Sequence, residues 1–384
     1  MRTPNSAIRP PCGSQSPSNF VDLFWRLQPH GPPSQPQPQL AFDGHRPPGL
    51  RLTAACLFYI HKMQDVRDAG EPFAALDADV ILRSSDNVDF RSYRIALKLA
   101  SPIFETMFAL PTPQRGSGGD EQKDGIAVVC MAENEKALRM LLSLCHANVE
   151  MALDTLDDIA TAVQLASKFE LQNARIAIRL LLREFASTDP ERVYALAWAM
   201  QSRELVLRAA EKSLSSPLIL PKRAETSVPE FHDISAHALR QLITFQSRCI
   251  FAASRIGEDL SWLRAGQIPA RGKEKGEDIG RCSSCHDTKV QLKEPTGRET
   301  RIKNWWLDYL KRVGKLFEED INAGGVVRNG LPILFACASD ASCSGGCTTQ
   351  EITSTLVLTA ESVVEVRIRE IVEEALQKLE TPFG

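Results

Sequence analysis

The segment that decides the fold is DADVILRSSDNVDFRSYRIALKLASPIFETMF, residues 77–108. Residues 80–83 and 88–90 are short runs rich in apolar side chains, and the Ser-Asp-Asn sequence at 85–87 between them favours a turn. The Ser-Pro pair at 101–102 predicts the start of a helix, because serine caps free backbone amides and proline fits the first helical position. The segment is therefore predicted to fold as a β-hairpin followed by a helix.

The residues downstream predict one more strand and three further helices. IAVVC at 126–130 is a short strand by its pattern. Apolar residues recur every three or four positions over 138–145, 155–166 and 171–181, and the second of these helices opens on a threonine-aspartate pair that resembles a capping box. A small sheet followed by helices is an α+β arrangement.

The spacing of residues within 77–108 resembles the opening of a BTB/POZ domain, most closely that of fungal BTB proteins. The residues that carry the resemblance are Asp79, Val80, Phe90, Leu97, Ser101, Phe104, Met107 and Phe108, with Tyr93 where many members carry histidine. The resemblance implies a BTB/POZ fold at 72–186, in which a helical cluster caps a small sheet, and a helical extension at 187–263.

The resemblance also implies a function in protein binding, with a second copy or another BTB protein as partner. Four apolar residues are candidates for that surface, although each could instead be an ordinary core residue: Leu97, Leu99, Ile103 and Phe104. Some BTB proteins are adaptors that bring a substrate to a cullin-type ubiquitin ligase, and in those an acidic residue typically follows the Met-Phe pair. This chain has Ala109 at that position, so it departs from the pattern, and the adaptor function is kept as an alternative.

Outside the BTB-like segment the composition suggests three further regions. Residues 1–71 are expected to be disordered, because 11 of the chain's 23 prolines lie in the first 50 residues and proline neither pairs in a sheet nor continues a helix. Residues 264–300 are expected to form a linker that carries a C-x-x-C sequence. Residues 301–384 are expected to form a mostly helical, cysteine-containing module.

The cysteines near the C-terminal end allow more than one interpretation. Four of them form two close pairs, and such pairs can hold a structural zinc ion through four thiolates: Cys282, Cys285, Cys343 and Cys347. Because 57 residues separate the two pairs, free thiols are the competing interpretation. Residues 282–286 also spell the c-type haem attachment sequence, so a metal- or haem-dependent redox protein is a third functional alternative.

Several functional classes find no support in the sequence. The phosphate-binding loop, the nucleophile elbow, the H-E-x-x-H zinc motif and the dinucleotide fingerprint are all missing, so we expect no enzymatic activity. A net charge of −3 does not suit a polycation that grips nucleic acid, and no stretch reaches the roughly 18 apolar residues of a membrane span. We expect a non-enzymatic interaction scaffold in the cytoplasm or nucleus.

Overall fold

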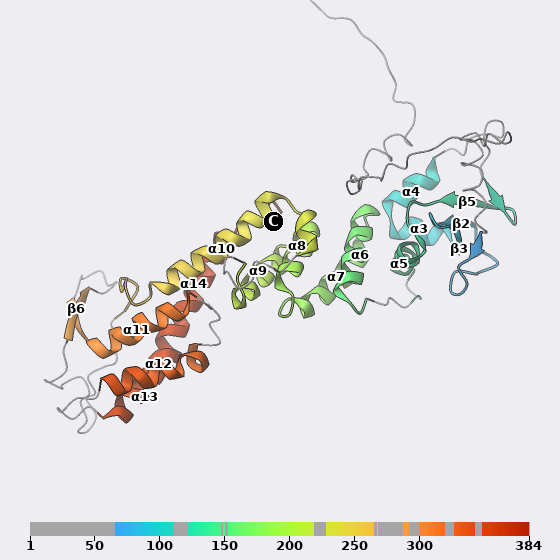
Figure 1. Cartoon of the computed structure of the whole chain (residues 1–384). Helices are drawn as coiled ribbons and strands as arrows, with labels where there is room; N and C mark the ends of the chain where they lie inside the picture. Colours follow the sequence, from blue (N-terminus) through green and yellow to red (C-terminus); the bar gives the residue numbers. More distant parts are fainter. Residues whose placement is uncertain are drawn as a thin grey trace, which may run out of the picture. The chain divides into compact units, whose positions relative to one another are not determined.

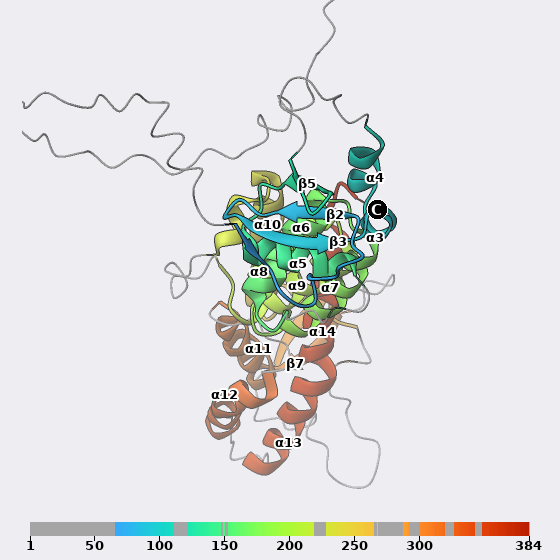
Figure 2. The ribbon, with the colours of Figure 1, turned by 90° about the vertical axis from the view of Figure 1, so that its right-hand side faces the viewer.

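A computed structural model gives the architecture of the second of two units into which the chain divides, residues 1–63 and 64–384. The structure describes residues 66–110, 121–146, 149, 153–218, 228–264, 267, 287–291, 299–318, 326–341 and 348–383. Their architecture is mixed α+β, with a small sheet and many helices (Figures 1 and 2).

Five short strands form the sheet, and its central hairpin is the one that the sequence predicts. The order across the sheet is β1 (Arg67–Asp68), β3 (Val88–Ser92), β2 (Val80–Arg83), β5 (Ile126–Cys130) and β4 (Gln122–Lys123). Strands β2 and β3 are antiparallel, while β1 runs parallel to β3 and β5 runs parallel to β2. Asn87 in the hairpin turn has a φ of 60°, a left-handed conformation that asparagine tolerates better than most residues.

The central strand β2 is buried on both of its faces. Val80 and Leu82 belong to the apolar core. Successive residues of a strand point to opposite faces, so Ile81 and Arg83 lie on the other side, and these two are buried as well.

Among the described residues, five helices lie around the sheet: α3 (Arg94–Ala100), α4 (Pro102–Ala109), α5 (Glu135–Cys145), α6 (Leu156–Lys168) and α7 (Gln172–Phe185). The sequence predicts the last four of them, and α3 is an additional helix. The hydroxyl oxygen of Ser101 accepts a hydrogen bond from the Phe104 amide at 3.2 Å, and it donates one to the Phe169 carbonyl at 2.6 Å. Thr155 caps α6 through a bond from the Asp158 amide, as the capping-box pattern predicts.

A second group of helices follows α7 along the chain. These are α8 (Pro190–Ala199), α9 (Arg203–Lys212), α10 (Ala236–Ser254), α11 (Asn304–Leu316), α12 (Val326–Asp340), α13 (Thr349–Thr359) and α14 (Glu365–Gln377), with short turns η1 (Ser213–Ser215) and η3 (Pro229–His232) and a π-helical turn η7 (Ala360–Val364). The terminal helix α14 directs one apolar face to the core, because Ile368, Ile371 and Ala375 are all buried. Helix α10 packs against α14 and α11.

Three strands lie where the sequence indicated other structure. Strand β1 falls inside the range 1–71 that we expected to be disordered; residues 1–65 of that range lie outside the described residues. Strands β6 (Asp287–Gln291) and β7 (Glu299–Lys303) form an antiparallel hairpin across the expected linker and the expected start of a helix. Val290 and Ile302 are the aliphatic residues of this hairpin, so the charged residues around them obscured the strand pattern.

None of the helices in the described part of the chain has the length and apolar character that crossing a membrane requires.

Candidate protein-interaction surface

The four residues predicted for an interaction surface do not share one surface. Leu97 and Phe104 are completely buried in the core, so they cannot contribute to a surface of the folded chain, and that part of the prediction is corrected. Ile103 is partly buried. Leu99 is the accessible member, with 79% of its surface exposed. Ile95, one turn earlier on the same face of α3, is 64% exposed.

The exposed face of α3 borders a groove of about 470 Å³, which also runs along the end of α5 and the first half of α7. Small side chains leave room in it, and apolar side chains form much of its wall: Ala96, Ala100, Ala174, Ala177, Leu99 and Leu144. Ile176 and Leu180 are exposed on α7, and each lies three residues after a residue of the groove wall, Asn173 and Ala177 respectively, so both border the groove. We call Ile95, Leu99, Ile176 and Leu180, together with this groove, the α3–α7 surface.

The polar groups in the groove are uncharged near neutral pH. Burial lowers the pKa of His146, so its imidazole is neutral, and its Nε2 atom lies 3.0 Å from the hydroxyl oxygen of Ser92. Burial also raises the pKa of the Cys145 thiol to about 12, so it stays protonated and is a poor nucleophile. The groove is therefore suited to apolar contact and not to chemistry by an activated thiol.

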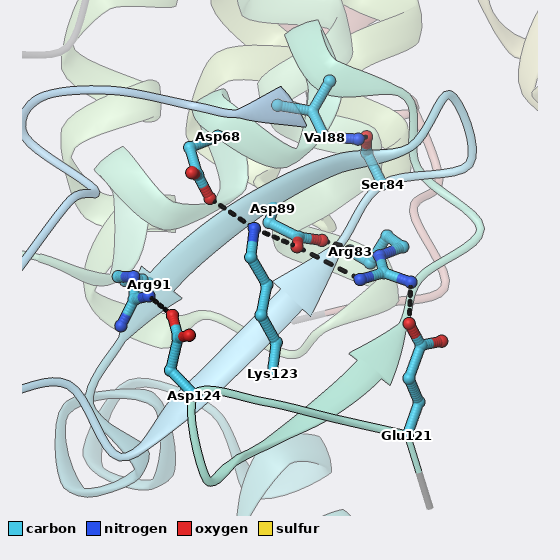
Figure 3. A network of polar contacts seen from close by, with 9 residues as sticks. All are labelled: Asp68, Arg83, Ser84, Val88, Asp89, Arg91, Glu121, Lys123 and Asp124. Atoms are coloured by element: carbon cyan, nitrogen blue, oxygen red, sulfur yellow. Dashed lines mark hydrogen bonds and ion pairs between the residues drawn. The ribbon is translucent and has the colours of Figure 1, made fainter. Parts of the chain in front are cut away.

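The face of the sheet that carries Arg83 holds a network of ion pairs (Figure 3). The buried carboxylate of Asp89 accepts hydrogen bonds from Arg83 Nε at 2.6 Å, Arg83 Nη2 at 3.1 Å and Lys123 Nζ at 3.0 Å. Lys123 also pairs with Asp68 at 2.7 Å, and Arg83 pairs with Glu121. Lys123 lies on β4 and Asp68 on β1, which are the two edge strands of the sheet. The Lys123–Asp68 ion pair therefore requires the sheet to curl, so that β4 approaches β1 and β3.

The charges of this network satisfy one another. Burial, the largest single influence, raises the pKa of Asp89, but the hydrogen bonds and charges of Arg83 and Lys123 outweigh it and lower the pKa overall. Arg91 pairs with Asp124 beside the network. Since the acidic and basic groups are paired with each other, we assign the network to holding the curled sheet together and not to a binding site.

The four cysteines predicted to hold zinc, and His286 beside them, lie outside the described residues. Cys337 is described and is buried. No group of three or more His, Cys, Asp or Glu side chains that could hold a metal ion is found among the residues that the structure describes. The zinc and haem interpretations therefore remain predictions from the sequence.

Sequence reasoning missed three residues of the α3–α7 surface: Ile95, Ile176 and Leu180. Helical spacing was a usable signal for Ile95, which precedes Leu99 by four residues. Ile176 and Leu180 are also four residues apart, but they lie between the apolar residues of 171–181 that predict the buried face, so packing decides which of the two sets stays outside.

Neither a comparison with models of protein families nor a comparison with curated proteins gives a match to this chain.

Proposed function

We propose that this chain is a non-enzymatic scaffold for protein–protein interaction, built on a BTB/POZ-like domain at residues 72–186 that associates with a second copy of itself. The observation that carries the proposal is the α3–α7 surface, where exposed aliphatic side chains adjoin a groove lined by small residues. Single exposed aliphatic residues are ordinary on protein surfaces, but an apolar patch beside a groove favours a partner.

A second copy suits this surface because the surface offers both a knob and a hole. Leu99 projects from α3, while Ala96 and Ala100 on the same helix leave space beside it. In a two-fold symmetric pair, Leu99 of each copy would enter the groove of the other, as a self-complementary interface requires. Burying one exposed leucine contributes about 1.5–3 kcal/mol, and each such contact occurs twice in a symmetric pair.

The mass of the protein in solution tests this proposal. We expect the full chain to sediment as a dimer at micromolar concentration and Leu99→Glu to sediment as a monomer, because a carboxylate in an apolar interface has no partner. Leu358→Glu is the matched control, since Leu358 is 63% exposed on α13, outside the α3–α7 surface. The control should keep the mass of the unmodified chain.

Two results would count against self-association through this surface. One is a full chain that stays monomeric over the whole concentration range. The other is a Leu99→Glu variant that keeps the dimer mass while its circular dichroism is unchanged. Affinity purification from cell extract addresses the alternative: recovery of a cullin with the full chain would support the adaptor function, and its loss with Leu99→Glu would place that contact on the same surface.

A further inference from the structure

The last described residues of the chain lie against α8 through an aromatic contact. The ring of Phe383 stands edge-on to the ring of Trp198, with centroids 5.3 Å apart and an interplanar angle of 76°. Edge-to-face pairs at this separation are a favourable arrangement for aromatic rings.

The surface that receives Phe383 is built by α8 and α10 without help from the tail. Tyr194 packs its ring 5.8 Å from Trp198, and its hydroxyl donates a hydrogen bond to the Ala238 carbonyl at 2.9 Å. His237 is exposed, and its ring centroid lies 6.3 Å from that of Trp198. We call Trp198 and His237 the aromatic platform; Tyr194 is completely buried and supports the Trp198 ring from within the core.

The tail itself is lightly attached. Helix α14 ends at Gln377, and Leu379 is buried, but Glu380 and Pro382 are exposed. The Thr381 hydroxyl donates to the Phe383 carbonyl at 2.9 Å, a bond within the tail. Residues 380–383 make no hydrogen bond to another helix or strand in the part of the chain that the structure describes. The Phe383 ring is therefore the main attachment of residues 380–383.

We infer that the aromatic platform is a binding site for short peptide segments that carry an aromatic residue, and that the chain's own tail occupies it. Partner segments of this chemistry would have to displace Phe383. The site lies on α8 and α10, so the inference does not rest on self-association through the α3–α7 surface.

Tethering explains how a weak contact can keep the site occupied. A short flexible link gives the attached ring an effective concentration on the order of millimolar, which a free peptide must overcome. Removing the Phe383 ring removes that competitor. If the free peptide binds with a dissociation constant of about 100 μM, a millimolar competitor of equal strength weakens its apparent affinity roughly tenfold.

The test uses a fluorescein-labelled synthetic peptide of residues 378–383, Lys-Leu-Glu-Thr-Pro-Phe, and fluorescence anisotropy. The peptide should bind the Phe383→Ala variant of the full chain about tenfold more tightly than it binds the unmodified chain. Glu380→Ala, an exposed change in the same tail, is the matched control and should behave as the unmodified chain does. A peptide with alanine in place of its phenylalanine should bind none of the three proteins.

Each other outcome would overturn the inference. Equal binding to the Phe383→Ala variant and the unmodified chain would show that the tail does not mask the platform. No binding to a Phe383→Ala variant that melts at the unmodified temperature would show that the platform is not a peptide site. A dimer that dissociates in Phe383→Ala, but not in Glu380→Ala, would assign the tail to the platform of a second copy in place of its own.

Discussion

The carboxylate of Asp89 is fully buried and accepts hydrogen bonds from two cations, Arg83 and Lys123. Such a group helps the folded state only while both its charge and its partners are in place. Replacing one member of a buried ion pair commonly costs about 3–5 kcal/mol, because the remaining charge loses its compensation. In this network Glu121 would still accept from Arg83, which favours the lower end of that range.

We predict that Asp89→Asn lowers the free energy of unfolding by about 3 kcal/mol at pH 7, measured by urea unfolding with circular dichroism. Asp124→Asn is the matched control, because Asp124 also pairs with an arginine but is exposed to solvent. That control should change stability by less than about 1 kcal/mol. Equal effects of the two substitutions would contradict the role given to burial.

The Asp89 carboxylate also makes the free energy of unfolding depend on pH. Its pKa in the folded protein is lower than the value of about 3.9 expected in the unfolded chain. The stabilisation is therefore complete only above about pH 5 and is lost as the pH falls through the folded-state pKa. Between pH 5 and pH 2 we expect Asp89→Asn to lose less stability than the unmodified protein, as measured by urea unfolding at each pH.

At the scale of elements, Ser101 connects the start of α4 to the end of α6. One hydroxyl caps α4 and also donates to the Phe169 carbonyl beyond α6, while the rings of Phe104 and Phe169 stack with centroids 5.2 Å apart. Ser101 therefore lies at the end of α3, caps the start of α4 and connects both to the end of α6 through its hydrogen bond to Phe169.

We predict that Ser101→Ala lowers the free energy of unfolding by about 2–3 kcal/mol, because it removes a helix cap and leaves a buried carbonyl without its donor. Ser235→Ala is the comparison, since Ser235 caps α10 through the Ala238 amide alone and lies at the surface. That change should cost about 1 kcal/mol. If urea unfolding gives the same loss for both variants, the bond to Phe169 contributes little.

Helix α10 illustrates where element-level reasoning from sequence fails. The sequence indicated a helix here from Leu239, Leu242, Ile243 and Ile250, and the helix is present. Its buried side is instead defined by Ala238, Leu242, Phe245, Cys249 and Ala253, while Ile243 is exposed. Small residues can face the core where another helix approaches closely, so hydrophobicity alone does not identify the inner face.

For the whole molecule, the sequence predicts where helices and strands occur better than it predicts which of their side chains are exposed or in contact. The hairpin at 80–92 and the helix starts at Ser101 and Thr155 follow from turn and capping chemistry, which acts over a few residues. The α3–α7 surface could not be found in this way, since the exposure of Ile176 depends on residues far along the chain. The same holds for Phe383, whose contact with Trp198 spans almost half the sequence.

The apolar core is also continuous across the boundaries at 186 and 263 that the sequence suggested. One cluster of buried side chains extends from Phe73 to Leu379 and includes residues of the BTB-like segment, the helical extension and the C-terminal module. The domain limits at 186 and 263 therefore stay predictions as limits of independent folding. Composition reports polarity along the chain, whereas the packing of α10 against α14 joins residues more than a hundred positions apart.

The burial of β2 on both of its faces determines which substitutions this strand tolerates. A strand with one wet face accepts polar substitutions at every second position. In β2 all four positions are buried, so a saturation library across Val80–Arg83 should show no such alternation in the fraction of variants that remain folded. Charged replacements should be rejected at Ile81 as strictly as at Leu82. Substitutions are thus expected to be less tolerated in β2 than in the exposed strand β1.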